Sequence, residues 1–231
     1  MKFKTDKNDV EAVSKIGKAN LLSKRGDKMT NYIFKPGDKS LAPVLVLHST
    51  GGDEQQLLPL AEDLFPNHPL LSIRGRVSEQ GINRYFKLKG AGFTKENFDL
   101  ESLSQESQWL ATEVTRLGEK HQLDLTRLAV IGYSNGANVA LYMQLKGLMQ
   151  FDRVLAFHAM QLTDIEEPVI ADESKIFLTH ADNDPIVSRA NLEELSSDLQ
   201  KTECELEVFK ANFGHQLSND ELVAAKRWLA T

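Results

Sequence analysis

The alternation of short apolar segments with segments of helical periodicity constrains the fold of this chain more than any other feature. Residues 43–48 contain the uninterrupted run Val-Leu-Val-Leu, which is typical of a strand buried on both faces of a sheet. Because strands that alternate with helices usually pair in parallel, the pattern predicts an α/β protein with a mostly parallel sheet and helices on both faces. Strands are expected at 31–35, 43–48, 70–73, 127–133, 153–157 and 175–179.

Between these strands, apolar residues recur at intervals of three and four, as they do on the buried face of a helix. The last helix opens with Ser218 and Glu221, which have the spacing of a capping box. Helices are expected around 58–65, 101–120, 137–148, 192–199 and 218–229.

Two segments depart from this pattern. In 203–209, Cys204, Leu206 and Val208 alternate with glutamates, which predicts a half-exposed strand near an edge of the sheet. Residues 74–99 are rich in glycine and charge, so they are predicted to form a long loop. This loop is the one candidate for a lid or pocket wall, since no insertion is long enough for a large helical cap.

Composition narrows the class of protein. The 231 residues are enough for one large domain, and their 41% hydrophobic and 26% charged content is ordinary for a globular protein. No apolar run approaches the roughly 18 residues of a membrane span, and the N-terminus lacks the apolar segment of a secretory signal. A single cysteine excludes an intrachain disulfide and a cysteine-based metal cluster. Without a span, a signal or a disulfide, a cytoplasmic location is the default expectation. The net charge of −6 argues against a nucleic-acid partner.

Residues 1–28 differ from the rest because they are polar and basic, with eight Lys or Arg and four Asp or Glu. We therefore expect a basic N-terminal extension at 1–28 and a single domain at 29–231. A weak apolar spacing at Val10, Val13 and Ile16 leaves open a short docking helix. A flexible tail or an upstream start codon is favoured instead, because chain ends are often loosely held.

The motif Gly132-Tyr133-Ser134-Asn135-Gly136 is the most informative for chemistry. A G-x-S-x-G motif is weak by itself, but here it joins an apolar strand to a helix with an apolar stripe. A nucleophile elbow occupies this position, where a sharp, strained turn exposes the serine hydroxyl above the sheet. Ser134 is therefore the candidate nucleophile, and a glycine-softened turn without catalytic meaning is the alternative.

A serine hydroxyl needs a base, which is usually a histidine oriented by a carboxylate. On a strand-to-helix elbow of this kind, the chain order is serine, acid, histidine. Asp182 and Asp184 follow one predicted strand and His215 follows another, so they lie where parallel α/β sheets place their ligands. His215 is favoured over His180 as the base, and Asp184 is favoured over Asp182 as the acid.

Attack on an ester also creates an oxyanion, which backbone N–H groups must stabilise. One N–H is expected from Asn135, the residue after the nucleophile. The other is expected from loop 48–54, the only glycine-bearing loop that follows an early strand in a suitable place. A flexible turn that leads into a helix is the alternative for this loop.

Four segments of the chain resemble the phospholipase/carboxylesterase family of α/β-hydrolases, which includes acyl-protein thioesterases. They are the oxyanion segment 47–54, the elbow 132–137, the acid loop 180–187 and the histidine loop 214–217, and the resemblance covers about 29–229. It implies an α/β-hydrolase fold without a large cap domain. It also implies that Asp184 is the acid and that Thr50 and Asn135 supply the oxyanion N–H groups.

A further resemblance is more specific. The segment 74–77 (Arg-Gly-Arg-Val), with Gly81 and Arg84-Tyr85-Phe86, is similar to a bacterial branch of short carboxylesterases, the MhqD-like hydrolases. Ser49 and Ala181 stand where the family usually has glycine. Ser49 puts the shape of the oxyanion loop in question, because its Cβ restricts φ.

The expected activity is hydrolysis of small carboxylic esters, with short-acyl or aryl groups, through an acyl-enzyme and without a metal or organic cofactor. The aromatic residues of 74–99 form either the pocket or the core, and its arginines either contact a polar substrate or pair with acids. The candidate pocket residues are His48, Arg74, Tyr85, Phe86 and Tyr133.

Two other functions stay open. An acyl-thioesterase or lysophospholipase would use the same residues with a long apolar groove, and a non-catalytic ligand-binding protein could share the fold. Cys204 is disfavoured as a nucleophile because it lies in an alternating strand. A small-molecule ester is the expected partner, and a homodimer is a further expectation because dimers are common in such families.

Overall fold

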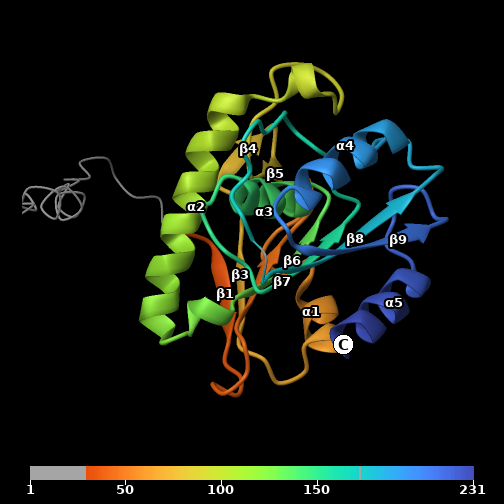
Figure 1. The fold of residues 1–231 in the computed structure, drawn as a ribbon. Helices are drawn as coiled ribbons and strands as arrows, with labels where there is room; N and C mark the ends of the chain where they lie inside the picture. The colour runs from red at the N-terminus through yellow and green to blue at the C-terminus, as the bar shows by residue number, and fades with distance from the viewer. Residues whose placement is uncertain (1–29, 172) are drawn as a thin grey trace, which may run out of the picture.

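A seven-stranded sheet forms the centre of the computed structural model, which describes residues 30–171 and 173–231 (Figure 1). The strand order is β1-β3-β2-β6-β7-β8-β9, and the β1–β3 pair alone is antiparallel within this sheet. The predicted mostly parallel sheet is confirmed, whereas the expectations for segment 1–28 lie outside the described residues. The strands are β1 (Tyr32–Lys35), β2 (Val44–Leu47), β3 (Leu70–Ile73), β6 (Ala129–Tyr133), β7 (Arg153–Phe157), β8 (Lys175–Ala181) and β9 (Glu205–Ala211).

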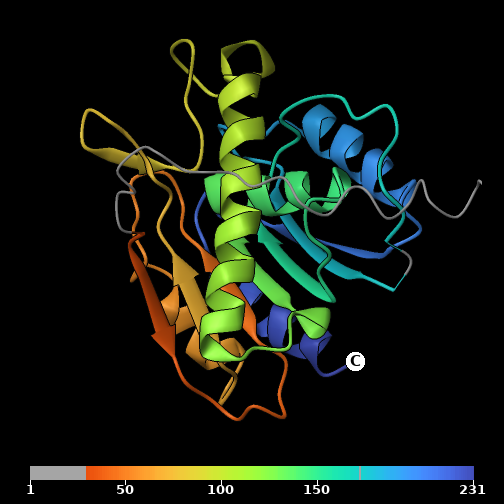
Figure 2. The same ribbon diagram turned by 90° about the vertical axis from the view of Figure 1, so that its left-hand side faces the viewer.

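Helices cover both faces of the sheet, as the alternating pattern predicts. Figures 1 and 2 show α2 standing along the face that also carries α3 and α4, whereas α1 and α5 lie on the opposite face. In the described part of the chain, no helix is both long and apolar enough to cross a membrane. The helices are α1 (Leu58–Leu64), α2 (Leu100–His121), α3 (Asn135–Leu145), α4 (Arg189–Gln200) and α5 (Asn219–Leu229).

Neighbouring side chains of each central strand enter different cores, which explains the uninterrupted apolar runs in the sequence. In β2, Leu45 and Leu47 belong to the core under α2, α3 and α4. Val44 and Val46 belong to the core under α1 and α5, and all four side chains are fully buried. Burial stabilises the fold by roughly 1.5–3 kcal/mol for each side chain of this size. The two cores therefore fix the strand from both sides.

The prediction of a loop over the whole of 74–99 is wrong in one part, because the segment contains an antiparallel hairpin. Strands β4 (Val77–Glu79) and β5 (Ile82–Arg84) pair across a turn at Gln80 and Gly81. Both turn residues have positive φ, 54° and 82°, as a two-residue type I′ turn requires. Glutamine is not typical of the first position of such a turn, and each strand has only 3 residues. The sequence pattern of 74–99 therefore did not reveal the hairpin. A short 3₁₀ turn, η2 (Lys95–Asn97), follows it.

Two elements end at positions that differ from the predicted ranges. Strand β8 continues to Ala181, so His180 is buried inside the strand. Helix α3 ends at Leu145 and does not reach 148, because Gly147 takes a left-handed φ of 65°.

Strand β9 lies at one edge of the sheet, as predicted, and its Glu205 and Glu207 are exposed while Leu206 packs against the core. The predicted alternation is wrong at two positions, because Val208 is exposed and Cys204 lies just before the strand. The last helix agrees with its prediction. Helix α5 begins with the predicted capping box, in which Ser218 and Glu221 bond to each other's backbone N–H groups.

Strand β6 and helix α3 meet in a tight turn with glycine on either side of Ser134. A Cβ atom at Gly136 would lie 2.2 Å from the Leu47 carbonyl oxygen, and one at Gly132 would lie 2.5 Å from the Ala137 nitrogen. Both contacts are with main chain, which cannot give way unless α3 moves away from the sheet. The two glycines of the motif therefore set how closely the helix approaches.

We expect Gly136→Ala to lower the free energy of unfolding by about 3 kcal/mol, because the added methyl group overlaps backbone. Gly81→Ala is the matched control, since nothing lies within 4 Å of the added Cβ. Its positive φ alone should cost about 1–2 kcal/mol. Urea unfolding measures both values, and equal losses would contradict the claim that the approach of α3 to β2 demands glycine.

Candidate active site

Ser134 occupies a sharp turn between β6 and α3. Its φ of 51° and ψ of −112° lie outside the regions that non-glycine residues favour, and such strain costs on the order of 1–3 kcal/mol. Hydrogen bonds hold the turn on both sides. The Ser134 N–H donates to the Phe157 carbonyl oxygen at 2.8 Å, and the Ser134 carbonyl oxygen accepts from the Asn138 N–H at 2.9 Å. The hydroxyl group is thereby presented at the carboxyl edge of the sheet.

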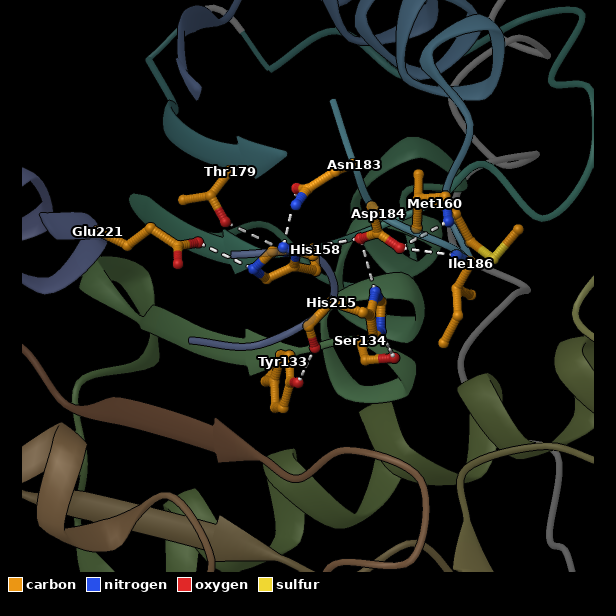
Figure 3. A network of polar contacts seen from close by, with 12 residues as sticks. Tyr133, Ser134, His158, Met160, Thr179, Asn183, Asp184, Ile186, His215 and Glu221 are labelled. Atoms are coloured by element: carbon orange, nitrogen blue, oxygen red, sulfur yellow. Dashed lines mark hydrogen bonds and ion pairs between the residues drawn. The ribbon is translucent and has the colours of Figure 1, made fainter. Parts of the chain in front are cut away.

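Three side chains from separate loops meet at this edge (Figure 3). His215 lies after β9, with Nε2 2.8 Å from Ser134 Oγ and Nδ1 2.7 Å from Asp184 Oδ2. The structure thus brings the predicted serine, acid and histidine into one hydrogen-bonded line. Asp182 is exposed and His180 is buried inside β8, so neither of the alternatives belongs to this line.

The Asp184 carboxylate is fully buried and accepts four hydrogen bonds. Oδ1 accepts from the N–H groups of Ile186 and Val187 at 2.8 Å and 3.0 Å, and Oδ2 lies 2.7 Å and 3.1 Å from the Nδ1 atoms of His215 and His158. Burial alone would raise the pKa of Asp184, but the two imidazoles and the two N–H groups hold it far below its usual value. Asp184 is therefore an anion at any neutral or mildly acidic pH.

His158 is part of this site, although the sequence analysis did not single it out. It follows β7 with a positive φ of 50°, and its side chain is fully buried. Nδ1 lies 3.1 Å from Asp184 Oδ2, and Nε2 lies 3.0 Å from Glu221 Oε1 (Figure 3). The one available signal was a histidine that follows an apolar strand at the edge where the other site residues gather.

The position of His158 between two buried carboxylates determines its charge. Each ring nitrogen needs a proton to face a carboxylate oxygen, so the ring is an imidazolium. Burial would lower the pKa of His158, but Asp184 and Glu221 raise it to about 9. Glu221 is itself buried, and its Oε2 accepts from the N–H and the hydroxyl group of Ser218 at the start of α5. The polar network around Asp184 and His158 therefore extends into that helix.

One atom from each of His158, Asp184 and His215 lies within 4.8 Å of the other two, a grouping that could hold a metal ion. A histidine ligand must be neutral at the coordinating nitrogen. His158 instead faces carboxylates with both nitrogens, and Nδ1 of His215 faces Asp184. The donor set therefore fits a proton network better than a metal site.

Ser134 and His215 border a cavity of about 200 Å³. Thr50 and Asn135, the predicted oxyanion residues, line the same cavity. Most of the remaining side chains are aromatic or aliphatic, so the serine hydroxyl faces a largely apolar space. They are Ser49, Arg84, Phe86, Phe93, Phe98, Tyr133, Asn138, Met160 and Ile186.

Two of the five candidate pocket residues, Phe86 and Tyr133, line this cavity. Phe86 is fully buried in its wall. The Tyr133 hydroxyl donates to the His215 carbonyl oxygen at 2.5 Å, and its ring stacks on the imidazole with centroids 5.8 Å apart. Tyr133 therefore also holds the histidine loop in place.

The other three candidate pocket residues, His48, Arg74 and Tyr85, are not part of the cavity lining. His48 Nε2 accepts from the Gly75 N–H at 3.0 Å, and the Tyr85 hydroxyl accepts from the His48 N–H at 3.1 Å. Arg74 pairs with Glu54 through two nitrogens. These contacts brace loop 48–54, so the three side chains support the loop from outside the cavity, although the side chain of Arg74 remains 29% exposed.

Ser49 does not distort this loop. Its N–H donates to Gln56 Oε1 at 2.8 Å. Its own φ is not positive, so the backbone there does not demand glycine. The left-handed position of the loop is instead occupied by Gly51, with φ of 80°. A serine is therefore compatible with the loop where the family usually has glycine.

The sheet, the elbow and the loops at its carboxyl edge define an α/β-hydrolase. Residues 30–231 match the family model described as Phospholipase/Carboxylesterase, and the chain belongs to this family of hydrolases.

Similar proteins agree with this assignment. MhqD of Bacillus subtilis (strain 168), named as a hydrolase, is 32% identical over 199 residues, which cover 85% of this chain and 96% of the relative. The structure of YahD with malic acid is 57% identical, with a TM-score of 0.86 over 87% of this chain and 98% of that one. The Bacillus cereus carboxylesterase is 31% identical, with a TM-score of 0.82, and the match covers 88% of this chain and 95% of that one. The resemblance to the family and to its MhqD-like branch is thus confirmed.

The charge of His158 predicts how stability depends on pH. A group whose pKa is raised by folding from 6.5 to about 9 contributes stability that is complete below pH 6.5 and is lost as the pH rises through about 9. A shift of this size corresponds to about 3 kcal/mol. We expect the stability difference between wild type and His158→Asn to shrink by that amount between pH 6.5 and 10.5, as measured by urea unfolding. A difference that stays constant over this range would contradict a buried imidazolium.

Proposed function

We propose that this chain is a serine carboxylesterase that hydrolyses small esters, with short-acyl or aryl groups, through an acyl-enzyme. The observation that carries the proposal is the line from Asp184 through His215 to Ser134, with distances of 2.7 Å and 2.8 Å, at the border of a small apolar cavity. In this proposal Ser134 is the nucleophile, His215 the general base and Asp184 the residue that orients it.

In the first half-reaction, His215 Nε2 accepts the hydroxyl proton while Ser134 Oγ attacks the ester carbonyl carbon. Asp184 holds the proton on Nδ1, so Nε2 is free to accept. The carbonyl oxygen becomes an oxyanion, which the N–H groups of Thr50 and Asn135 stabilise. The tetrahedral adduct then collapses, and the alcohol leaves with the proton that His215 returns. In the second half-reaction water takes the place of the alcohol and releases the acid.

The charges of the network support this sequence of proton transfers. His215 becomes an imidazolium during each attack, and an ionised Asp184 stabilises that charge. The low pKa of Asp184 keeps it ionised, and His158 neutralises part of the buried negative charge between attacks. In deacylation, His215 accepts a proton from the attacking water and returns it to Ser134 Oγ when the acyl bond breaks. The substrate, water and side chains of this chain thus account for every proton, so the mechanism requires no cofactor.

The size of the cavity supports small substrates. Its volume of about 200 Å³ is below the range of about 300–1,000 Å³ that is usual for ligand pockets. Phe86, Phe93 and Phe98 enclose it with apolar surface. The related YahD structure contains malic acid, which is also a small molecule. A long acyl chain would need a groove beyond this cavity.

Ser134→Ala is the first test of the mechanism. Because a triad nucleophile has no substitute, we expect kcat/KM for p-nitrophenyl acetate to fall by about 10⁴-fold or more. Ser197→Ala, at an exposed serine of α4, is the control that should keep wild-type activity. A Ser134→Ala protein that is folded and retains activity within about tenfold of wild type would refute the mechanism.

The acyl-length profile tests the substrate class. We expect kcat/KM to be highest for p-nitrophenyl esters of two to four acyl carbons and to fall steeply by eight, because the cavity cannot hold a longer chain. A preference for long chains would favour the acyl-thioesterase or lysophospholipase alternative. A folded protein inactive on every ester would favour a ligand-binding role.

A further inference from the structure

The cavity beside Ser134 contains a cation whose nearest carboxylate, that of Glu79, is not part of the cavity lining. Arg84 lines the cavity, and no aspartate or glutamate of the described residues does so. Its side chain is 9% exposed, so most of the arginine is withdrawn from solvent. A buried charge normally has a close partner of opposite sign, because transfer out of water is otherwise costly.

The contacts of Arg84 compensate its charge only in part. The nearest carboxylate, on Glu79, stays 3.8 Å from Nε and is 37% exposed. The guanidinium carbon lies 5.5 Å from the centre of the Phe93 ring, which offers a weak cation–π contact. Among the described residues, none accepts a hydrogen bond from this guanidinium, which has five N–H donors.

The neighbouring arginines show what a paired guanidinium looks like in this protein. Arg74 contacts both carboxylate oxygens of Glu54, and Arg76 contacts both of Glu106, with Nε–Oε2 at 2.6 Å. Neither of them lines the cavity. The arginine at the candidate active site is the one among these three without a bidentate acid.

Rigid elements hold Arg84 in this position. It ends strand β5, and the next N–H, of Tyr85, donates to Asn135 Oδ1 at 2.8 Å. Asn135 directly follows Ser134, so the arginine is anchored to the elbow itself. Gly75 packs so closely on the Arg84 carbonyl that a Cβ there would lie 2.2 Å from its oxygen. The main chain that carries Arg84 is therefore fixed relative to the elbow, and the side chains of Arg84 and Ser134 line the same cavity.

We propose that Arg84 binds a free carboxylate on the substrate, so that the preferred substrates are small esters that also carry a carboxylate group. The inference rests on the proposed esterase function and names its substrate class. A guanidinium matches a carboxylate with two parallel hydrogen bonds, and the aromatic walls around it strengthen the attraction by excluding water. Burial lowers the pKa of Arg84, and Glu79 offsets this only in part, so a bound anion would supply the missing compensation.

Matched esters test the proposal. Monomethyl glutarate carries the charge on the acyl side, and methyl 5-oxohexanoate is its neutral isostere. Acetoxyacetate and acetonyl acetate are the corresponding pair for the alcohol side. Acid release in a pH-stat gives kcat/KM for each substrate with wild type, Arg84→Gln, Arg84→Lys and the control Arg76→Gln.

In at least one pair, we expect wild type to prefer the charged ester. Arg84→Gln should lower kcat/KM for that ester by about 10–100-fold, the usual range for losing a hydrogen-bonded charge pair. It should leave the neutral isostere within about threefold. Arg84→Lys should lie between the two, because a lysine keeps the charge but loses the paired geometry. Arg76→Gln should change neither substrate.

Three other results would overturn the proposal. Wild type could cleave neutral esters and show no preference for the charged member of either pair. This result needs no variant, and it would refute the role of Arg84 while leaving the esterase function intact. Arg84→Gln could lower activity equally on charged and neutral esters, which would assign Arg84 a structural role. Wild type could cleave no ester at all, in which case the proposed function itself fails.

Discussion

The buried carboxylate of Asp184 is the group on which the rest of the site depends. It has no exposed surface, and two imidazoles and two backbone N–H groups share its two oxygens. Such a charge is stable only while its partners remain, because the removal of one leaves an uncompensated buried ion. Through His158 the carboxylate is tied to Glu221 and to the start of α5, and through His215 it is tied to Ser134.

The parallel sheet explains why these groups meet. β6, β7, β8 and β9 are consecutive in the sheet, and each contributes one residue of the network just beyond its carboxyl end. Those residues are Ser134, His158, Asp184 and His215. The chain just after the hairpin β4–β5 is anchored to the same edge, because the Tyr85 N–H donates to Asn135 Oδ1. This one hydrogen bond links the residues that follow Arg84 and Ser134, and the side chains of Arg84 and Ser134 line the same cavity.

The sequence predicts the features of the site that depend on residues close together in the chain or on the order of residues along it. The elbow, the order of serine, acid and histidine, and the capping box at Ser218 and Glu221 each follow from spacing. The link from His158 to Asp184 and Glu221 has no such signal, because its members are far apart in the chain and a single histidine is ambiguous. Glu221 had an obvious role as a cap, which concealed its contact with His158.

Pocket residues were harder to predict, because adjacent residues of one segment point in different directions. Tyr85 turns its hydroxyl to the main chain at Ile73 and His48, whereas Phe86 faces the cavity. Arg74 and Arg84 belong to the same segment, but only Arg74 finds a bidentate glutamate. The sequence does not reveal this pairing, because Glu54 lies 20 residues before Arg74 and meets it only in the folded structure.

The central claim is that Asp184 and His215 activate Ser134, and the rate of labelling by a fluorophosphonate tests it most directly. Peptide mass spectrometry would locate the adduct in wild type and in Asp184→Asn. We expect one adduct on Ser134 in wild type and a labelling rate lower by about 10³–10⁴-fold in Asp184→Asn, because His215 loses the correct tautomer. An adduct on another residue, or equal rates in a folded Asp184→Asn, would contradict this claim.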